Sequence, residues 1–178
     1  MFVDRNGDGQ INQHDLYKSK LADPQTFLGF TTNVSYRKWS VGFVLRSSLG
    51  NYAYNNNFSQ TGTSNQIVAN SVLYNGSSNY LATHFKGNAQ ELLSDYYIQN
   101  ASFLRMDNAT IGYNLGAIAH TRTKIRLNAS VQNVFIITKY KGLDPEIAAN
   151  SSTAGNPGID NNLYPRPRTY NLGVNLDF

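Results

Sequence analysis

Oxygen-bearing residues recur at alternate positions near the start of the sequence, within a run of twelve residues that ends in a carboxylate. Oxygen donors that converge from one tight turn are the ligands that hard cations such as Ca²⁺ prefer. Gly9 follows the third donor, at the point where such a loop turns sharply. The sequence therefore predicts a metal site, with calcium as the expected ion, formed by Asp4, Asn6, Asp8, the backbone carbonyl of Gln10, and Asp15.

This spacing resembles the calcium loop of an EF-hand, with two departures. Position twelve is Asp15, which is shorter than the Glu that binds calcium through both oxygens in that motif. The sequence also leaves no room for a helix before Asp4. An Asp, Asn and Gly-rich turn that holds no ion is the alternative. A bound calcium would stiffen the loop, and no cofactor is required.

Groups suited to catalysis are missing elsewhere in the sequence. Cysteine is absent, which excludes disulfides, structural zinc thiolates and thiol catalysis. The three histidines lie far apart, and no serine elbow, phosphate-binding loop or carboxylate dyad occurs. We therefore expect the chain not to be an enzyme.

Two charged segments have a structural interpretation. Asp144 and Glu146 flank Pro145, and we expect the proline to shape a loop while both acids remain solvated. Residues 164–168 form a stiff basic run with two prolines that hold it extended. Its arginines could pair with acids of neighbouring loops or contact a ligand, and the structural role is favoured.

The composition favours a membrane β-barrel. Of 178 residues only 40% are hydrophobic and 15% charged, yet the chain carries 12 Tyr, 9 Phe and 1 Trp. Such a balance is typical of strands whose lipid-facing half alone is apolar. No apolar run is long enough for a transmembrane helix, and the positive charges are too scattered for nucleic-acid binding. Because no signal peptide occurs either, we expect a piece whose N-terminal part is missing.

Apolar and polar residues alternate in five segments, the pattern of strands. In the last segment Leu172, Val174 and Leu176 share one face, while asparagines and a glycine share the other. In the third segment the phase of the alternation changes, which predicts a β-bulge near Asp107 or Asn108. A soluble sandwich with one wet face would give the same alternation. The five segments are 28–37, 39–48, 102–115, 125–132 and 170–178.

The lengths of the connections favour the membrane barrel, because short and long links alternate strictly. Outer-membrane barrels place short turns on the periplasmic side and long loops outside. Aromatic residues at the short turn and at the final residue fit a periplasmic girdle. The predicted organisation is an outer loop at 1–24 with the calcium-type turn, a hairpin at 26–50, an outer loop at 51–95, a hairpin at 102–135, an outer loop at 138–168, and a final strand at 169–178.

The expected fold is thus all-β: part of an antiparallel transmembrane β-barrel, with about five C-terminal strands of a larger barrel. Five strands cannot close, because the smallest such barrels have eight, and open edges in lipid leave backbone groups unpaired. The polar strand faces are expected to line the lumen through Arg46, Asn128, Gln132 and Asn175.

Several motifs, in this order along the chain, resemble the late barrel of SusC/RagA-type TonB-dependent transporters. The most specific is Gln132-Asn133-Val134-Phe135 followed by 138–146, Thr-Lys-Tyr-Lys-Gly-Leu-Asp-Pro-Glu. The others are 4–15 with Asp23-Pro24, Leu28-Gly29-Phe30, Tyr36-Arg37, 94–98, 101–106, Ile111-Gly112-Tyr113, Tyr164-Pro165-Arg166 and the terminal Phe178.

This resemblance implies a function and partners. Members of the family lie in the bacterial outer membrane, couple to TonB through an N-terminal part that this sequence lacks, and import glycans or peptides beneath a SusD-like surface lipoprotein. The terminal aromatic resembles the signal read by the barrel-assembly machinery. Two rival interpretations are a soluble calcium-dependent carbohydrate-binding β-sandwich and a piece of a secreted glycosidase, for which no paired acids are present.

Overall fold

The structure is a computed structural model of the whole chain. It describes residues 3–69, 72–87, 91, 94–117, 123–146, 158–160 and 164–178.

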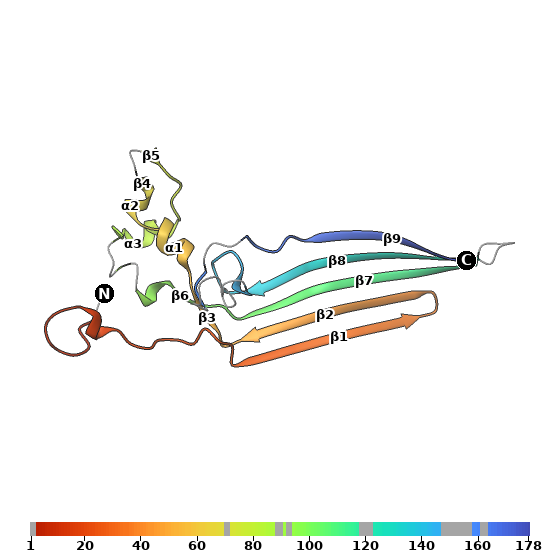
Figure 1. Ribbon diagram of the computed structural model, residues 1–178, viewed down its shortest axis with the longest axis horizontal. Coiled ribbons are helices and arrows are strands. Elements are labelled where there is room, and N and C mark those ends of the chain that lie inside the picture. The colour runs from red at the N-terminus through yellow and green to blue at the C-terminus, as the bar shows by residue number, and fades with distance from the viewer. Residues whose placement is uncertain are drawn as a thin grey trace.

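Five long antiparallel strands form one sheet and run side by side along the molecule (Figure 1). Their order in the sheet is β1–β2–β7–β8–β9, so each strand pairs with the next long strand of the chain. This confirms the predicted all-β fold with five antiparallel strands. The bounds are β1 Thr26–Tyr36, β2 Trp39–Leu49, β7 Phe103–Ala117, β8 Lys124–Thr138 and β9 Thr169–Asp177.

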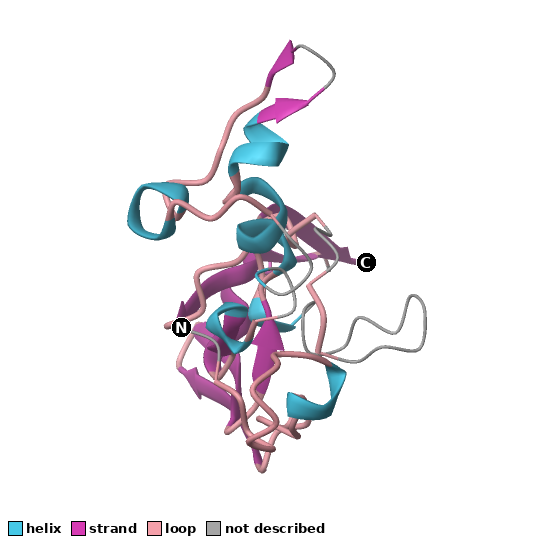
Figure 2. Cartoon of the chain, turned by 90° about the vertical axis from the view of Figure 1, so that its left-hand side faces the viewer, coloured by secondary structure: helices cyan, strands magenta, loops and turns pink. Residues whose placement is uncertain are grey.

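The remaining elements are short and gather at one end of the sheet (Figure 1). Most belong to the connection from Asn51 to Ala101 between β2 and β7, which we call the lobe. In the lobe β3 pairs with β6 and β4 pairs with β5. Figure 2 shows the β4–β5 hairpin projecting away from the sheet. The elements are η1 Gln13–Asp15, β3 Tyr52–Tyr54, α1 Asn56–Thr61, α2 Ser64–Ile67, β4 Val68–Ala69, β5 Val72–Leu73, α3 Tyr80–Thr83, η2 Asp95–Tyr97 and β6 Ile98–Asn100.

The register of the sheet gathers the apolar residues on one face. Val34 pairs with Val41, Val41 with Ile111, and Ile111 with Ala129, which in turn pairs with Leu172. Because neighbouring residues of a strand point to opposite faces, the polar residues between them share the other face. The apolar face stays exposed, at Leu28, Phe30, Val34, Tyr36, Trp39, Val41, Ile111, Leu127, Leu172, Val174 and Leu176.

Within the described residues, this open face differs from the face expected of the β-sandwich alternative. A sandwich would bury the apolar face beneath a second sheet, whereas Leu172 is 89% exposed. Among the residues that the structure describes, the other two sheets are two-stranded and lie in the lobe, where Tyr54 of β3 also forms a bridge to Ile159. No helix in the described part of the chain is long and apolar enough to cross a membrane.

A bulge interrupts the pairing of β7, as the change of phase predicted. Leu45 of β2 pairs with Met106 while Val44 pairs with Asn108, which leaves Asp107 as the extra residue. On the other side the register between β7 and β8 shifts at the same place. The bulge keeps the apolar residues before and after it on one face, since the extra residue restores the alternation.

The two ends of the sheet differ. At one end β1 and β2 join through the predicted tight turn, where Arg37 has a left-handed φ of 55°. Trp39 and Tyr113 contact each other beside this turn, with ring centroids 4.6 Å apart. Most of the link predicted at 116–123 lies outside the described residues. Among the described residues, the buried hydrophobic side chains lie at the other end, close to the lobe: Ala53, Tyr97, Ala101, Phe103 and Tyr140.

Candidate functional site

A cluster of charged side chains lies on the polar face beside the bulge. Arg46 and Arg105 pair across β2 and β7, so the register puts two guanidinium groups side by side on this face. The bulge residue Asp107 forms an ion pair with Arg46 through both guanidinium nitrogens Nε and Nη2. One carboxylate does not balance two arginines, and the remaining anions come from a distant segment.

Those anions belong to the loop that follows β8. Asp144 Oδ1 lies 2.6 Å from Arg105 Nη2. Glu146 accepts two parallel hydrogen bonds from Arg46, at 2.9 Å from Nη1 and 3.0 Å from Nη2. Because β7 separates β8 from β2 in the sheet, the loop must fold back across the polar face to reach Arg46.

The segment before β9 completes the cluster. Arg166 Nη2 lies 3.2 Å from Glu146 Oε1, which confirms that an arginine of 164–168 pairs with an acid of a neighbouring loop. Arg168 Nε instead donates a hydrogen bond to the backbone carbonyl of Asn133 at 3.2 Å. The side-chain amide of Asn133 in turn donates to the carbonyl of Pro167 at 2.8 Å. The segment after β8 and the segment before β9 are therefore both bonded to the sheet.

The expectation that Asp144 and Glu146 are solvated is wrong. Their exposed fractions are 5% and 6%, and Arg105 is only 3% exposed. A single sequence shows two acids in a loop, but the arginines that cover them come from strands whose register the loop itself does not reveal. Three arginines and three carboxylates meet here, so the cluster is neutral. Its chemistry is the anchoring of a loop by desolvated ion pairs.

A second buried polar network lies where the lobe meets the sheet. The hydroxyl of Tyr140 donates to Asp160 Oδ2 at 2.8 Å, and burial together with this carboxylate raises the pKa of Tyr140. Asn51 Nδ2 donates to the carbonyl of Ala101 at 3.2 Å. Burial also raises the pKa of Tyr97 to about 12. Sequence analysis missed these residues, because isolated Asn, Asp and Tyr residues in a long connection carry no periodic signal.

The predicted metal ligands lie together in one loop. Asp4 accepts from the backbone amides of Gly7 at 2.6 Å and Gly9 at 2.7 Å, which closes the turn. Asp15 accepts from the amides of Arg5 and Asn12, and these hydrogen bonds, that from Asn12 foremost, lower the pKa of its carboxyl group.

The atoms that this loop could offer to a metal ion are all oxygens, as calcium requires. Asp8 accepts from the amide of Gln10 at 2.7 Å, so the carboxylates serve first to order the loop. No three His, Cys, Asp or Glu side chains of the described residues form a group that could hold a metal. The calcium site stays a prediction.

The residues predicted to line a lumen share the polar face. Register places Asn128 opposite Gly112 on one side and Gly173 on the other, and Arg126 opposite Asn175. Arg126 reaches across the face to donate to the hydroxyl of Ser40 at 2.9 Å. Gln132 and Arg46 lie on the same side of the sheet.

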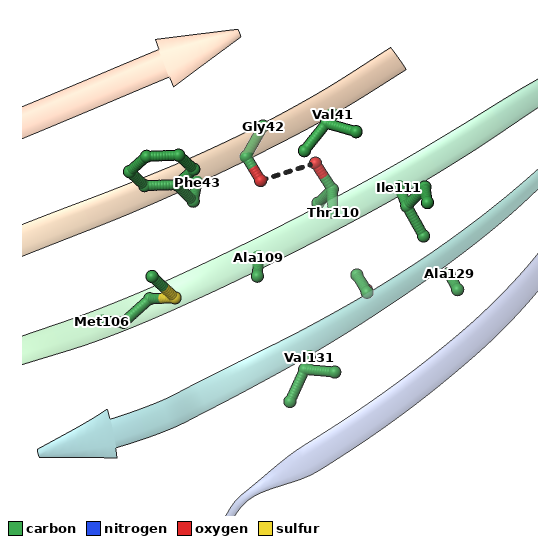
Figure 3. A pocket seen from close by; sticks show the side chains of 10 residues that line it. Val41, Gly42, Phe43, Met106, Ala109, Thr110, Ile111, Ala129 and Val131 are labelled. Carbon is green, nitrogen blue, oxygen red and sulfur yellow. Dashed lines mark hydrogen bonds between the residues drawn. The ribbon is translucent and has the colours of Figure 1, made fainter. Parts of the chain in front are cut away.

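The opposite, apolar face has a shallow hollow of about 280 Å³ (Figure 3). It lies over the small side chains Ala109 and Ala129, between the larger Phe43, Met106 and Val131. The hydrogen bond between Thr110 and the carbonyl of Gly42, drawn in Figure 3, joins β2 and β7 on its polar side. No charged side chain lines this hollow, so it is suited to hydrocarbon rather than to a polar ligand.

Comparison with known proteins gives matches along the whole chain, although no protein-family model matches. The chain is 40% identical to the TonB-dependent receptor SusC of Bacteroides thetaiotaomicron, over all of this chain and 17% of that receptor. It is 26% identical to the TonB-dependent receptor P3 of Formosa agariphila, over all of this chain and 19% of that receptor. The chain therefore spans less than a fifth of the curated relatives that it matches.

Solved structures agree on the fold. The RagAB peptide transporter matches with a TM-score of 0.70 and 22% identity over 95% of this chain and 19% of that chain. The RagAB peptide importer in its closed-closed state matches with a TM-score of 0.66 and 22% identity over 96% of this chain and 20% of that one. With the two-faced sheet and the similarity to SusC, these matches show that the chain is a fragment of a SusC/RagA-type TonB-dependent receptor.

Proposed function

We propose that the receptor containing this chain imports nutrients across the bacterial outer membrane, and that this chain supplies part of its barrel wall and outer loops. The observation that supports this most is the sheet itself, whose apolar face is exposed while its polar face buries charged groups. Lipid on one side and water on the other would satisfy both faces at once.

The sidedness follows from the connections. Short periplasmic turns and long outer loops are the rule in these barrels. We assign the end with the lobe to the outside and the end with the turn at Arg37 to the periplasm, because the long connections gather at the former (Figure 1).

The partners follow from the family. A SusD-like surface lipoprotein would cover the outer loops, and TonB would contact parts of the receptor outside this chain. The final strand would present Phe178 to the barrel-assembly machinery. Either an oligosaccharide or a peptide would be the ligand; RagAB, which is described as a peptide importer, shares the fold.

Calcium at the loop of Asp4 to Asp15 is the second part of the proposal. The ion would bind Asp4, Asn6, Asp8, the Gln10 carbonyl and Asp15 and stiffen an outer loop. Titration calorimetry of the full-length receptor with CaCl₂ should give a saturable heat that Asp8→Ala abolishes. A receptor that gives no heat, or an Asp8→Ala variant that keeps it, would remove the calcium site.

Cell fractionation tests the main proposal. The receptor should sediment with outer membranes, resist extraction by alkaline carbonate, and migrate faster on gels before boiling than after. Deleting its gene should abolish energy-dependent uptake of its nutrient, which growth on a panel of oligosaccharides and peptides would identify. Recovery of the receptor in the periplasmic fraction after osmotic shock would contradict the proposal.

A further inference from the structure

Three aromatic rings form a row across the apolar face, at the end of the sheet away from the lobe. Register pairs Tyr36 with Trp39 and Trp39 with Tyr113. Tyr36 is 66% exposed and Trp39 is 49% exposed. Tyrosine and tryptophan concentrate where hydrocarbon meets the lipid headgroups, because each has an apolar ring and a polar tip. We therefore take this aromatic row as one boundary of the hydrocarbon layer.

The length of β2 supports this position. A rise of about 3.4 Å per residue at a tilt of about 45° puts Trp39 and Leu49 roughly 24 Å apart along the membrane normal. The apolar band of an outer-membrane barrel is about 25 Å tall. The turn residues Arg37 and Lys38 extend about 5 Å further, which keeps them within a headgroup layer of roughly 5–8 Å on each side.

The turn between β1 and β2 has an unfavourable residue at its first position. Because Tyr36 pairs with Trp39, the turn consists of Arg37 and Lys38 alone. Arg37 has a left-handed φ of 55°, which glycine adopts freely and a long side chain adopts only at a cost. Backbone strain of this kind is concentrated at positions with a function. An arginine at this position therefore indicates a role for its side chain outside the turn.

Two positive charges lie at this turn without a negative partner among the described residues. The guanidinium carbon of Arg37 lies 5.2 Å from the ring centroid of Tyr36, which holds the cation on the apolar side of the sheet. Arg37 and Lys38 are both exposed, and neither forms an ion pair within the described part of the chain. The one acid described at this end is Asp177 on β9, and β7 and β8 separate that strand from the turn. The phosphate of a neighbouring lipid would supply the missing negative charge.

We propose that Arg37 and Lys38, together with the aromatic row, bind the headgroup of an anionic phospholipid in the periplasmic leaflet of the outer membrane. The two cations pair with the phosphate, while the acyl chains lie along the apolar face beyond the aromatic row. A zwitterionic lipid carries a cation of its own that offsets its phosphate, so the site prefers a lipid with net negative charge. This inference rests on the proposed position of the receptor in the outer membrane.

A fluorescent label in the full-length receptor tests the inference. Cysteine would replace Val34, an exposed residue of the apolar face close to the aromatic row, in a receptor without other accessible cysteines. The labelled receptor would be placed in phosphatidylcholine vesicles that hold increasing fractions of phosphatidylglycerol with brominated acyl chains. Bromine quenches the label on contact, so the phosphatidylglycerol fraction that gives half of the maximal quenching measures the local affinity.

Substitutions in the turn should weaken this affinity. Arg37→Gly should raise the half-quenching fraction about fivefold, which is the contribution of one basic residue near an anionic membrane surface. Glycine also adopts the left-handed φ, so the turn is retained. The double variant Arg37→Gly/Lys38→Gln should quench equally with brominated phosphatidylglycerol and brominated phosphatidylcholine. In 1 M NaCl the unmodified receptor should lose most of its preference, because salt screens exposed charges.

Two matched controls separate this site from general effects of charge. Lys124→Gln removes a positive charge at the same end of the sheet, but from the polar face, where Lys124 is opposite Asp177. It should leave the quenching unchanged. A label at Leu28, an exposed residue at the other end of β1, should respond equally in the unmodified receptor and in the double variant.

The inference is overturned if the two brominated lipids quench the Val34 label of the unmodified receptor equally, if the double variant keeps the preference, or if Lys124→Gln loses as much of it. Thermal unfolding in uncharged detergent adds a further check. Arg37→Gly should be at least as stable there as the unmodified receptor, and a lower stability would mean that the arginine serves the turn itself. Failure of the importer proposal looks different: no brominated lipid of either kind would quench the label, because the apolar face would not lie in a membrane.

Discussion

The two faces of the five-stranded sheet differ in which side chains they bear and in what covers those side chains. On the polar face Arg105 is 3% exposed, because carboxylates from the chain itself cover it. On the apolar face Leu172 is 89% exposed, because no described part of the chain covers it. Water-soluble proteins show the opposite distribution, with leucine inside and arginine outside.

This difference shows what each face needs from its surroundings. The polar face supplies its own partners and can be stable next to water. The apolar face needs a solvent that does not penalise exposed hydrocarbon, which is the role of lipid in a membrane barrel. The comparison predicts that substitutions on the polar face destabilise the receptor because buried charges lose their partners within the chain. Charged substitutions on the apolar face should destabilise it because they place a charge in lipid.

Asp144→Ala should have the largest effect. It leaves Arg105 buried without its closest carboxylate, and breaking a buried ion pair costs about 3–5 kcal/mol. Urea unfolding of the full-length receptor in lipid vesicles would measure the change in the free energy of unfolding. Asp23→Ala, at an exposed acid that forms no ion pair with the described residues, serves as the control.

A double variant distinguishes lost pairing from lost volume. Arg105→Met combined with Asp144→Leu removes both charges, so most of the stability should return. If the double variant is as unstable as Asp144→Ala, the cost lies in packing and the polar face does not depend on its ion pairs.

Ile111→Arg comes next and tests the other face. Ile111 lies near the middle of β7, where a lipid-facing arginine costs roughly 2–4 kcal/mol in a membrane barrel. Thr110→Arg is the matched control, since its side chain points to the polar face of the same strand. Equal losses for the two variants would mean that the faces do not differ in their surroundings.

Much of this contrast could be predicted from the sequence. The alternation of Leu172, Val174 and Leu176 identified β9, and the change of phase near Asp107 located the bulge, because both patterns are local. The position of Glu146 could not be predicted, because it depends on a loop that crosses two strands. For the lobe the sequence predicts a loop alone, since helices as short as α1 give too few turns for a periodic signal.

Tyr140→Phe should have a smaller effect, because it removes one neutral donor from Asp160 and no charge. We expect a loss of about 1 kcal/mol by urea unfolding at neutral pH. The raised pKa of Tyr140 adds a pH dependence: its contribution is complete below pH 10 and is lost as pH rises above that value. Tyr140→Phe should therefore lose less stability at alkaline pH than the unmodified receptor; an equal loss would remove this account of the Tyr140–Asp160 pair.

Arg166→Ala should have the smallest effect on stability. Its side chain is 45% exposed, and an ion pair so open to water contributes about 0–1 kcal/mol. Glu146 also keeps Arg46 as a partner. A loss as large as that of Asp144→Ala would mean that the outer edge of the cluster, rather than its buried centre, anchors the loop.

Spin labels along β9 test the central contrast most directly. Cysteine would replace residues 170–176 one at a time in the full-length receptor in lipid vesicles, and each label would be challenged with oxygen, which enters lipid, and with a water-soluble nickel chelate. Labels at Tyr170, Leu172, Val174 and Leu176 should respond to oxygen, and those at Asn171, Gly173 and Asn175 to nickel. Equal access of the nickel chelate to both sets would contradict the assignment of the apolar face to lipid.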